Sequence, residues 1–220
     1  MPCSLDMQNT KTEKRRPPRF ELSAGILCLD FVNTLDDRPS DEPKELLAQY
    51  ADLVRFAEDT GILTSRQADH LAQRADARPD DAQQTLRSAI ELREAMYGIF
   101  WALANRRKVP PPALETLNKF VREAGSHSVL VQTNGHFVLQ FDDHGNPEPA
   151  FDAILWPIVQ SAADLLVSDQ LPFVRTCSSK TCQWLFVDTS KSHRRRWCNM
   201  RLCGNRAKVR RFYARQKRAG

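Results

Sequence analysis

The chain has 220 residues, 41% of them hydrophobic, which suffices for one medium-sized domain with a real core and a small additional module. It contains no run of about 18 apolar residues, so no membrane-spanning helix is expected. Residues 1–20 are charged and polar with no apolar stretch behind them, unlike a secretory signal. We therefore expect a cytoplasmic protein, where thiols stay reduced and clustered cysteines bind metal more often than they form disulfides.

The net charge of +5 conceals two parts of opposite sign. Residues 171–220 contain 14 Lys and Arg but one acidic residue, Asp188, a local net charge of +13. Residues 1–170 hold the other 18 basic and 26 acidic residues, a net of −8. A short segment with this much positive charge repels itself unless an anion lies nearby. A solvated basic tail would need no cysteines, so a folded module is the better interpretation.

The first 45 residues are predicted to form a basic arm and one short helix. Residues 1–19, with the sequence KRRPPR, are polar and are expected to be disordered. In GILCLDFVNTLDDR the apolar residues are too dense for a clean period. This predicts a mostly buried helix over residues 26–35, ended by the turn-forming residues 36–43.

The next part of the chain is predicted to be helical. Gly61 stops the first helix of this part, and Thr64 with Gln67 forms a capping box that opens the second. Three consecutive prolines, residues 110–112, are expected to break the chain before the fourth. The four helices are predicted over residues 44–60, from Thr64 onward, over 79–107 and over 113–123.

A β-hairpin and a last helix complete this region. Two short apolar runs, residues 128–132 and 136–141, flank the turn Thr133-Asn134-Gly135, a typical hairpin signal. A helix over residues 151–168 follows, and a short linker leads to the basic segment. Residues 20–170 are therefore predicted to be a mainly helical domain with a small β-hairpin.

The cysteines of the basic segment have the spacing of a metal site: Cys177-x4-Cys182-x15-Cys198-x4-Cys203. Two cysteine pairs a short span apart can supply two turns that together place four sulfurs around one tetrahedral Zn²⁺. The alternatives are four buried free thiols or, after oxidation, two disulfides. His193 could also compete as a ligand.

The order of elements around these cysteines predicts the fold of the segment. Residues five apart on a helix differ by roughly 140°, so Cys198 is expected in the turn before a helix and Cys203 in its first turn. QWLFVD is predicted to be a strand, with Trp184 and Phe186 as a miniature core. A cysteine turn, a hairpin and a ligand-bearing helix are typical of a treble-clef zinc finger. The expected fold class is thus α+β: a helical N-terminal domain plus a treble-clef-like finger over residues 171–220.

The C-terminal helix is predicted to have a basic face. Arg206, Arg210, Tyr213 and Lys217 fall within roughly 60° of one another on a helix. An adjacent face is expected to close over the metal core; it consists of Leu202, Val209, Phe212 and Gln216. Ahead of the helix, the loop between the cysteine pairs carries Arg194, Arg195 and Arg196.

Arginine clusters of this kind suit phosphate oxygens, and Trp197 or Tyr213 could stack on a base, so nucleic acid is the expected partner. Three other roles for the charge stay open. One or two arginines could neutralise a four-thiolate zinc centre, the basic face could dock on an acidic protein, including this chain's own acidic domain, or it could simply be solvated.

Two motifs give the chain a family resemblance. WCNMRLCGNRAKVRRFY, which contains Cys203-Gly204-Asn205-Arg206, resembles the CGNR zinc finger. GILCLDFVNTLDDR resembles the opening motif of the ABATE domain, which precedes that finger in bacterial proteins described as stress-induced transcription regulators. The resemblance implies a zinc finger for DNA and an N-terminal domain that senses a signal, such as a small ligand.

A polar stripe marks the candidate sensing site. Asp30, Asn33, Thr34 and Asp37 recur at helical spacing on an otherwise buried segment. They could form a ligand pocket in which Asp30 and Asn33, helped by Arg93, bind a polar small molecule. In the structural alternative Asp30 pairs with an arginine such as Arg93, while Asn33 and Thr34 cap the helix.

The sequence therefore predicts a zinc-dependent, DNA-binding transcription regulator rather than an enzyme. A single finger contacts few base pairs, so dimerisation is expected to be needed for specificity, although the sequence reveals no dimer interface. The first alternative is an RNA-binding or ribosome-associated zinc-finger protein. The second is a small-molecule enzyme with the finger as scaffold, for which no catalytic motif is found.

Overall fold

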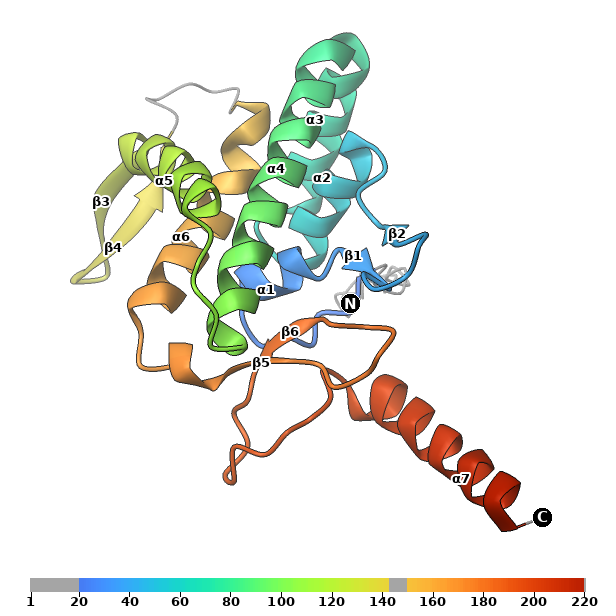
Figure 1. The fold of residues 1–220 in the computed structure, drawn as a ribbon. Helices are drawn as coiled ribbons and strands as arrows, with labels where there is room; N and C mark the ends of the chain where they lie inside the picture. The colour runs from blue at the N-terminus through green and yellow to red at the C-terminus, as the bar shows by residue number, and fades with distance from the viewer. Residues whose placement is uncertain (1–19, 143–149, 220) are drawn as a thin grey trace, which may run out of the picture.

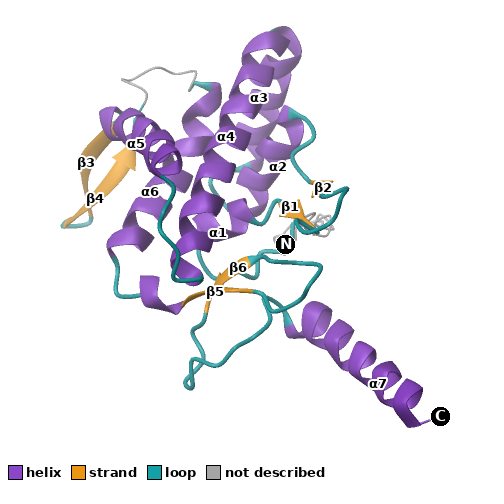
Figure 2. Ribbon diagram, in the orientation of Figure 1, coloured by secondary structure: helices purple, strands orange, loops and turns teal. Residues whose placement is uncertain are grey.

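The computed structural model describes residues 20–142 and 150–219, so the predicted basic arm lies outside the described residues. Helices dominate, joined by three small antiparallel sheets of two strands each (Figure 2). The elements run in the order α1 (Leu27–Val32), β1 (Leu35–Asp36), β2 (Lys44–Glu45), α2 (Tyr50–Asp59), α3 (Ser65–Ala77), α4 (Pro79–Ala104), α5 (Pro111–Ser126), β3 (Ser128–Thr133), β4 (His136–Phe141), the 3₁₀ turn η1 (Phe151–Ile154), α6 (Leu155–Val167), the 3₁₀ turn η2 (Leu171–Phe173), β5 (Val174–Thr176), β6 (Leu185–Val187), the π-helical turn η3 (Met200–Gly204) and α7 (Asn205–Ala219).

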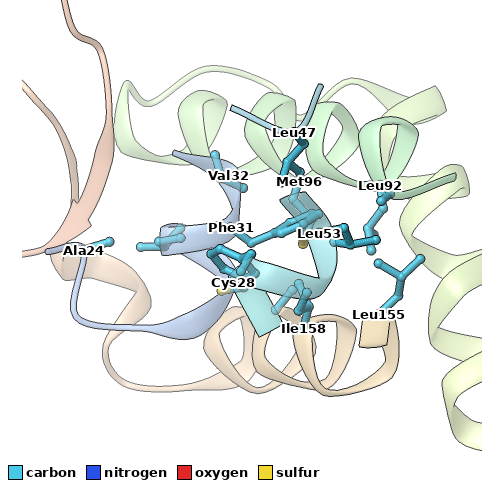
Figure 3. Packing of buried hydrophobic residues seen from close by; sticks show 14 of the residues in the cluster. Ala24, Cys28, Phe31, Val32, Leu47, Leu53, Leu92, Met96, Leu155 and Ile158 are labelled. Atoms are coloured by element: carbon cyan, nitrogen blue, oxygen red, sulfur yellow. The ribbon is translucent and has the colours of Figure 1, made fainter. Parts of the chain in front are cut away.

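The short helix α1 lies at the centre of the core. Its Cys28 and Phe31 are fully buried and pack among side chains of α2, α4 and α6, including Leu53, Met96 and Ile158 (Figure 3). A helix surrounded on all sides needs apolar residues all round, which explains why the sequence shows no clean period here. Burying each such side chain contributes about 1.5–3 kcal/mol, so α1 anchors the packing of its three neighbours.

The polar stripe predicted on this helix is wrong in its geometry, because α1 ends at Val32. The chain turns there into β1, and the Thr34 carbonyl oxygen accepts a hydrogen bond from the Leu46 amide, 3.0 Å away. The Asn33 side chain makes hydrogen bonds to the backbone of Leu185 in β6. Tertiary hydrogen bonds thus end the helix five residues before Asp37, the last residue of the predicted stripe.

The helix predicted over residues 44–60 begins too early. Lys44 and Glu45 form β2, paired with β1, and α2 starts only at Tyr50, where Gln49 and Asp52 make a capping box. The cause is the Glu45 carboxylate, which accepts hydrogen bonds from the Leu47 amide and from an arginine of α4. The other capping box, predicted at the start of α3, is confirmed.

The later elements agree with the sequence in type but not at every boundary. The helix α4 and the hairpin β3–β4 are confirmed, with positive φ angles at Asn134 and Gly135 in the hairpin turn. However, α5 begins at Pro111, so two of the three prolines occupy its first turn rather than lying before it. Proline fits there because the first amides of a helix have no intrahelical acceptor.

The C-terminal module is packed onto the helical part rather than tethered to it. All three residues of β6, Leu185, Phe186 and Val187, are buried in the same continuous apolar cluster as α1 and α4. The helix α7 departs from this mass and projects away from it (Figure 1). The predicted class, a mainly helical protein with small hairpins and a C-terminal cysteine-based finger, is confirmed.

Candidate metal centre and nucleic-acid interface

The four cysteines of the C-terminal module meet at one point. The sulfurs of Cys177, Cys182, Cys198 and Cys203 all lie within 4.8 Å of one another, and all four residues are buried. The Cys182–Cys198 and Cys198–Cys203 sulfur pairs are 3.6 and 3.7 Å apart. A tetrahedral ion with Zn–S bonds of ~2.3 Å requires sulfurs about 3.8 Å apart, whereas a disulfide requires about 2.05 Å. The donors therefore fit a single four-thiolate zinc ion.

The pKa values of the four cysteine thiols also favour a bound cation. Hydrogen bonds from Cys182 and Cys198 lower the pKa of Cys177 to about 2. The hydrogen bond to Cys177 raises the pKa of Cys182 and of Cys198, and burial raises that of Cys203. Four sulfurs this close cannot all ionise beside one another in the absence of a positive ion, and bound Zn²⁺ would remove this conflict.

Backbone hydrogen bonds hold the two cysteine turns in place. The Cys177 amide donates to the Trp184 carbonyl oxygen at 2.8 Å, and the Ser178 amide donates to that of Arg196 at 2.8 Å, which ties the first turn to the second. In the second turn the Asn199 side chain accepts from the Arg201 amide at 2.8 Å. Cys203 lies in η3, two residues before α7 begins, and so slightly earlier than the predicted first turn of the helix.

His193 is not part of the cluster. Its ring stacks on Phe173, with centroids 4.1 Å apart, and its Nδ1 donates to the Asp188 carbonyl oxygen at 3.0 Å. Its role as a competing ligand is therefore not supported by the structure.

The finger is fixed to the helical part by the motif that follows α1. The Asn33 side chain donates to the Leu185 carbonyl oxygen at 2.9 Å and accepts from the Leu185 amide at 3.0 Å. Trp184 Nε1 donates to the Leu35 carbonyl oxygen at 3.3 Å. Trp184 and Phe186 therefore pack against the helical part, rather than forming a separate miniature core.

A buried acid organises the arginine loop between the cysteine pairs. Asp188 is fully buried and accepts hydrogen bonds from the Ser190 hydroxyl at 2.6 Å and from the Arg195 amide at 2.8 Å. Burial alone would raise the pKa of Asp188, but the Ser190 hydrogen bonds lower it below the usual range. The one acid of residues 171–220 is therefore enclosed within the loop, away from the exposed basic side chains.

Arg195 also points inward. Its guanidinium donates to the Trp197, Cys198 and Ser23 carbonyl oxygens and lies 4.4 Å from the centroid of the Phe186 ring. These contacts give Arg195 a structural role. Its neighbours Arg194 and Arg196 are exposed, as a nucleic-acid contact would require.

Two open pockets beside the first cysteine turn are lined by several of the other basic side chains. One, about 330 Å³ in volume, is lined by Arg196, Trp197 and Arg210 together with Lys180 and Arg211. The other, about 370 Å³, brings Lys180 and Thr181 next to Arg206, and Asp37 of the helical part lines it as well. The structure thus adds cations that were not singled out from the sequence, and their nearness to the predicted ones follows only from the fold. Among the side chains that the structure describes, the exposed basic ones of the module are Lys180, Lys191, Arg194, Arg196, Arg201, Arg206, Lys208, Arg210 and Arg211.

The expected inner face of α7 does not close over the metal. Val209 and Phe212 are 53% and 58% exposed, because α7 leaves the finger and makes few contacts beyond its first turn (Figure 1). The sequence pattern is that of an amphipathic helix, but no other element of the described part of the chain packs against its apolar side. Lys217 belongs to α7, although its side chain lies outside the described part.

The candidate ligand residues of the helical part already have partners in the protein. Arg93 is 2% exposed and forms a bidentate ion pair with Glu45, at 2.6 and 2.7 Å, and another with Glu94 at 2.9 Å. Burial alone would lower its pKa, but Glu45 raises it. Asp30 accepts from the Ala24 amide at 2.9 Å, and burial raises its pKa to about 6. The suggested Asp30–Arg93 pair is wrong.

Four buried thiolates between a hairpin loop and a helix define a zinc-finger protein of treble-clef-like architecture. Residues 174–216 match the CGNR zinc finger family. Residues 25–169 match the ABATE family, described as "Putative stress-induced transcription regulator". Because this match spans more than half of the sequence, the chain belongs to the ABATE family. The comparison with curated proteins found no similar sequence.

Neither matched family is a family of enzymes. In the part of the chain that the structure describes, no helix is long and apolar enough to cross a membrane.

Proposed function

We propose that this protein is a zinc-dependent transcription regulator whose finger binds duplex DNA and whose helical part responds to a small-molecule signal. The observation that carries the proposal is the charge of the finger surface. Its one acid, Asp188, is enclosed by hydrogen bonds, while nine basic side chains of the described part are exposed around the cysteine turns and on α7. Such a surface attracts a polyanion, and each phosphate contact releases counterions.

The shape of α7 favours duplex DNA over a small anion. The helix has 15 residues, hence a length of about 22 Å, and its sequence is rich in Arg and Lys. It projects from the body (Figure 1). A helix of this kind fits the major groove of B-DNA, which is about 12 Å wide. Arg206 and Arg210, with Lys217, are the proposed helix contacts, and Arg194 and Arg196 the proposed loop contacts to phosphate.

RNA is the second candidate, and the exposed aromatic pair on α7 favours it. Phe212 and Tyr213 present rings to solvent, as proteins that stack unpaired bases do. Trp197 is a poorer platform, because it is half-buried and the Arg196 guanidinium lies 5.3 Å from its ring centroid.

A signal from the helical part would reach the finger through packed contacts. The Asn33–Leu185 hydrogen bonds join the segment after α1 directly to β6, which leads into the arginine loop. A ligand that displaces Asp30, Asn33 or Arg93 from their present partners would alter this junction. Ligand binding by these three residues remains a prediction, as does a cytoplasmic location, where the thiols would stay reduced.

The test is a binding titration of the full zinc-loaded chain against a duplex DNA and an RNA hairpin at two salt concentrations. Arg206→Ala with Arg210→Ala should weaken binding and reduce the slope of log K against log salt by about 2, at roughly 0.9 per lost phosphate contact. Arg66→Ala is the matched control, because Arg66 is equally exposed but lies on α3, outside the finger.

Tight, salt-sensitive binding to the duplex with an altered slope in the double variant would support the proposal. Binding to the RNA hairpin alone would transfer the function to RNA. If neither nucleic acid bound, an acidic protein would become the expected partner of the basic surface.

A further inference from the structure

The segment that leads into α1 runs along the finger. The Glu21 carboxylate accepts a hydrogen bond from the Asn199 side chain at 2.6 Å. The Ser23 carbonyl oxygen accepts one from the Arg195 guanidinium at 3.3 Å, and that of Ala24 accepts one from the last amide of β6 at 3.0 Å. Three hydrogen bonds in four residues therefore hold this segment, which belongs to the helical part, against the arginine loop and the second cysteine turn.

The first described residue of the chain is also fixed in place. Phe20 is 4% exposed, and its ring packs edge-on against that of Phe56 in α2, with the centroids 5.3 Å apart. The point at which residues 1–19 join the fold is thus determined by a buried side chain on one side and by the Glu21–Asn199 hydrogen bond on the other. It lies beside the basic surface of the finger.

The residues joined at this point are strongly basic. Residues 14–19, KRRPPR, contain four cations and no acid: Lys14, Arg15, Arg16 and Arg19, here called the arm cations. The domain that follows has the opposite charge, since residues 20–170 carry 13 basic and 24 acidic side chains. Covalent geometry alone keeps Lys14 within about 22 Å of Phe20, at no more than about 3.6 Å per residue. The arm cations therefore stay close to the finger whatever conformation they adopt.

The acids at this junction already have partners. Glu21, the one acid of residues 20–26, accepts from Asn199, and Asp188, the one acid of the finger, accepts from Ser190 and Arg195. Two basic groups brought side by side in this way repel each other unless an anion lies between them. A polyanion bound to the finger would meet both groups at once, and this favours binding.

We propose that the arm cations form a second nucleic-acid contact, which binds duplex phosphates next to those bound by the finger. This inference rests on the proposed function, because it requires that the finger bind DNA. A reach of about 22 Å corresponds to about six phosphates along one strand of a duplex, which is enough for four cations. The contact adds affinity and fixes the direction in which the helical part lies along the DNA, but it reads no bases.

The test compares two fourfold variants of the full zinc-loaded chain in titrations with duplex DNA between 50 and 200 mM salt. One variant replaces the arm cations: Lys14→Ala, Arg15→Ala, Arg16→Ala and Arg19→Ala. The matched control replaces four exposed cations of α3, α4 and α5: Arg66→Ala, Arg87→Ala, Lys119→Ala and Arg122→Ala. Both variants have a net charge of +1 instead of +5, so only the place of the lost charge differs. Removing the arm cations should lower the slope of log K against log salt by about 3 to 4, at roughly 0.9 per lost phosphate contact. The control should keep the wild-type slope.

The outcomes separate this inference from the proposed function. A wild-type chain that binds no duplex overturns the proposed function and the arm contact with it. A wild-type chain that binds the duplex with the same slope as the arm variant overturns the arm contact alone, and the arm cations would then pair with the acidic helical part. Equal losses of slope in the two fourfold variants also overturn it, because net charge rather than position would then set the affinity. Zinc content and thermal melting should be unchanged in both variants, since none of the replaced side chains belongs to the core or to the cysteine cluster.

Discussion

Asn33 and Leu185 are joined by a pair of hydrogen bonds although 152 positions separate them in the sequence. The Asn33 side-chain amide donates to the Leu185 carbonyl oxygen and accepts from the Leu185 amide, as the backbone of a neighbouring strand would. Both residues are buried, at 3% and 0% exposure. One side chain of the helical part thereby satisfies the outer edge of the finger's hairpin and fixes the orientation of the two parts.

Asn33→Ala should strongly destabilise the protein. The change leaves the Leu185 amide and carbonyl oxygen buried without partners, and each unsatisfied group costs about 1–3 kcal/mol. We expect the free energy of unfolding, measured by urea denaturation of the zinc-loaded chain, to fall by about 2–4 kcal/mol. Asn105→Ala is the control, because its hydrogen bonds to Trp101 and Thr176 are exposed; it should cost less than about 1 kcal/mol. Equal losses in the two variants would contradict the proposed role of Asn33.

Cys203→Ser should abolish stoichiometric zinc binding, because three thiolates and a hydroxyl hold Zn²⁺ far less tightly than four thiolates. Metal analysis should give about one zinc per wild-type chain. The loss should loosen η3 and α7 more than β6, which is held by Asn33 whether or not the metal is bound. Cys28→Ser, a change at a buried cysteine of α1, should keep its zinc. Unchanged zinc content in Cys203→Ser would disprove the four-thiolate assignment.

Two adjacent arginines should give opposite results. Arg195→Ala removes hydrogen bonds to three carbonyl oxygens and the contact with the Phe186 ring, so it should lower the thermal stability of the finger. Arg194→Ala changes an exposed side chain and should leave stability within about 0.5 kcal/mol of the wild type, while it weakens nucleic-acid binding. Thermal melts and binding titrations on both variants make the comparison. Identical profiles would reject the distinction between an inward and an outward arginine.

Asp30 should make the stability depend on pH between about 4 and 6. Burial raises its pKa from 3.8 to about 6 in the folded protein, so folding favours the protonated form. The resulting stabilisation is fully present below pH 4 and is lost as the pH rises through 6. Relative to Asp30→Asn, the wild type should lose about 2 kcal/mol over this range, allowing for the partial exposure of the group. Urea titrations at both pH values measure the difference, and parallel curves for the two proteins would contradict it.

The sequence by itself determined the features that depend on local chemistry. Cysteine spacing predicted the four-thiolate cluster, since few arrangements of two short turns satisfy a tetrahedral ion. The Thr64 capping box and the Asn134-Gly135 turn were also predicted correctly, because their hydrogen bonds and φ angles involve only neighbouring residues.

Only the tertiary structure decided the roles of the buried polar residues. Asn33, Arg93 and Arg195 are each satisfied by a group far away in the sequence or on another element, and no local pattern predicts which group that will be. The same reason explains why α1 is short and why α2 starts late: a buried hydrogen bond to a distant partner outweighs a helical period. It also explains α7, whose apolar stripe is real but faces solvent, because packing depends on what the rest of the chain places opposite it.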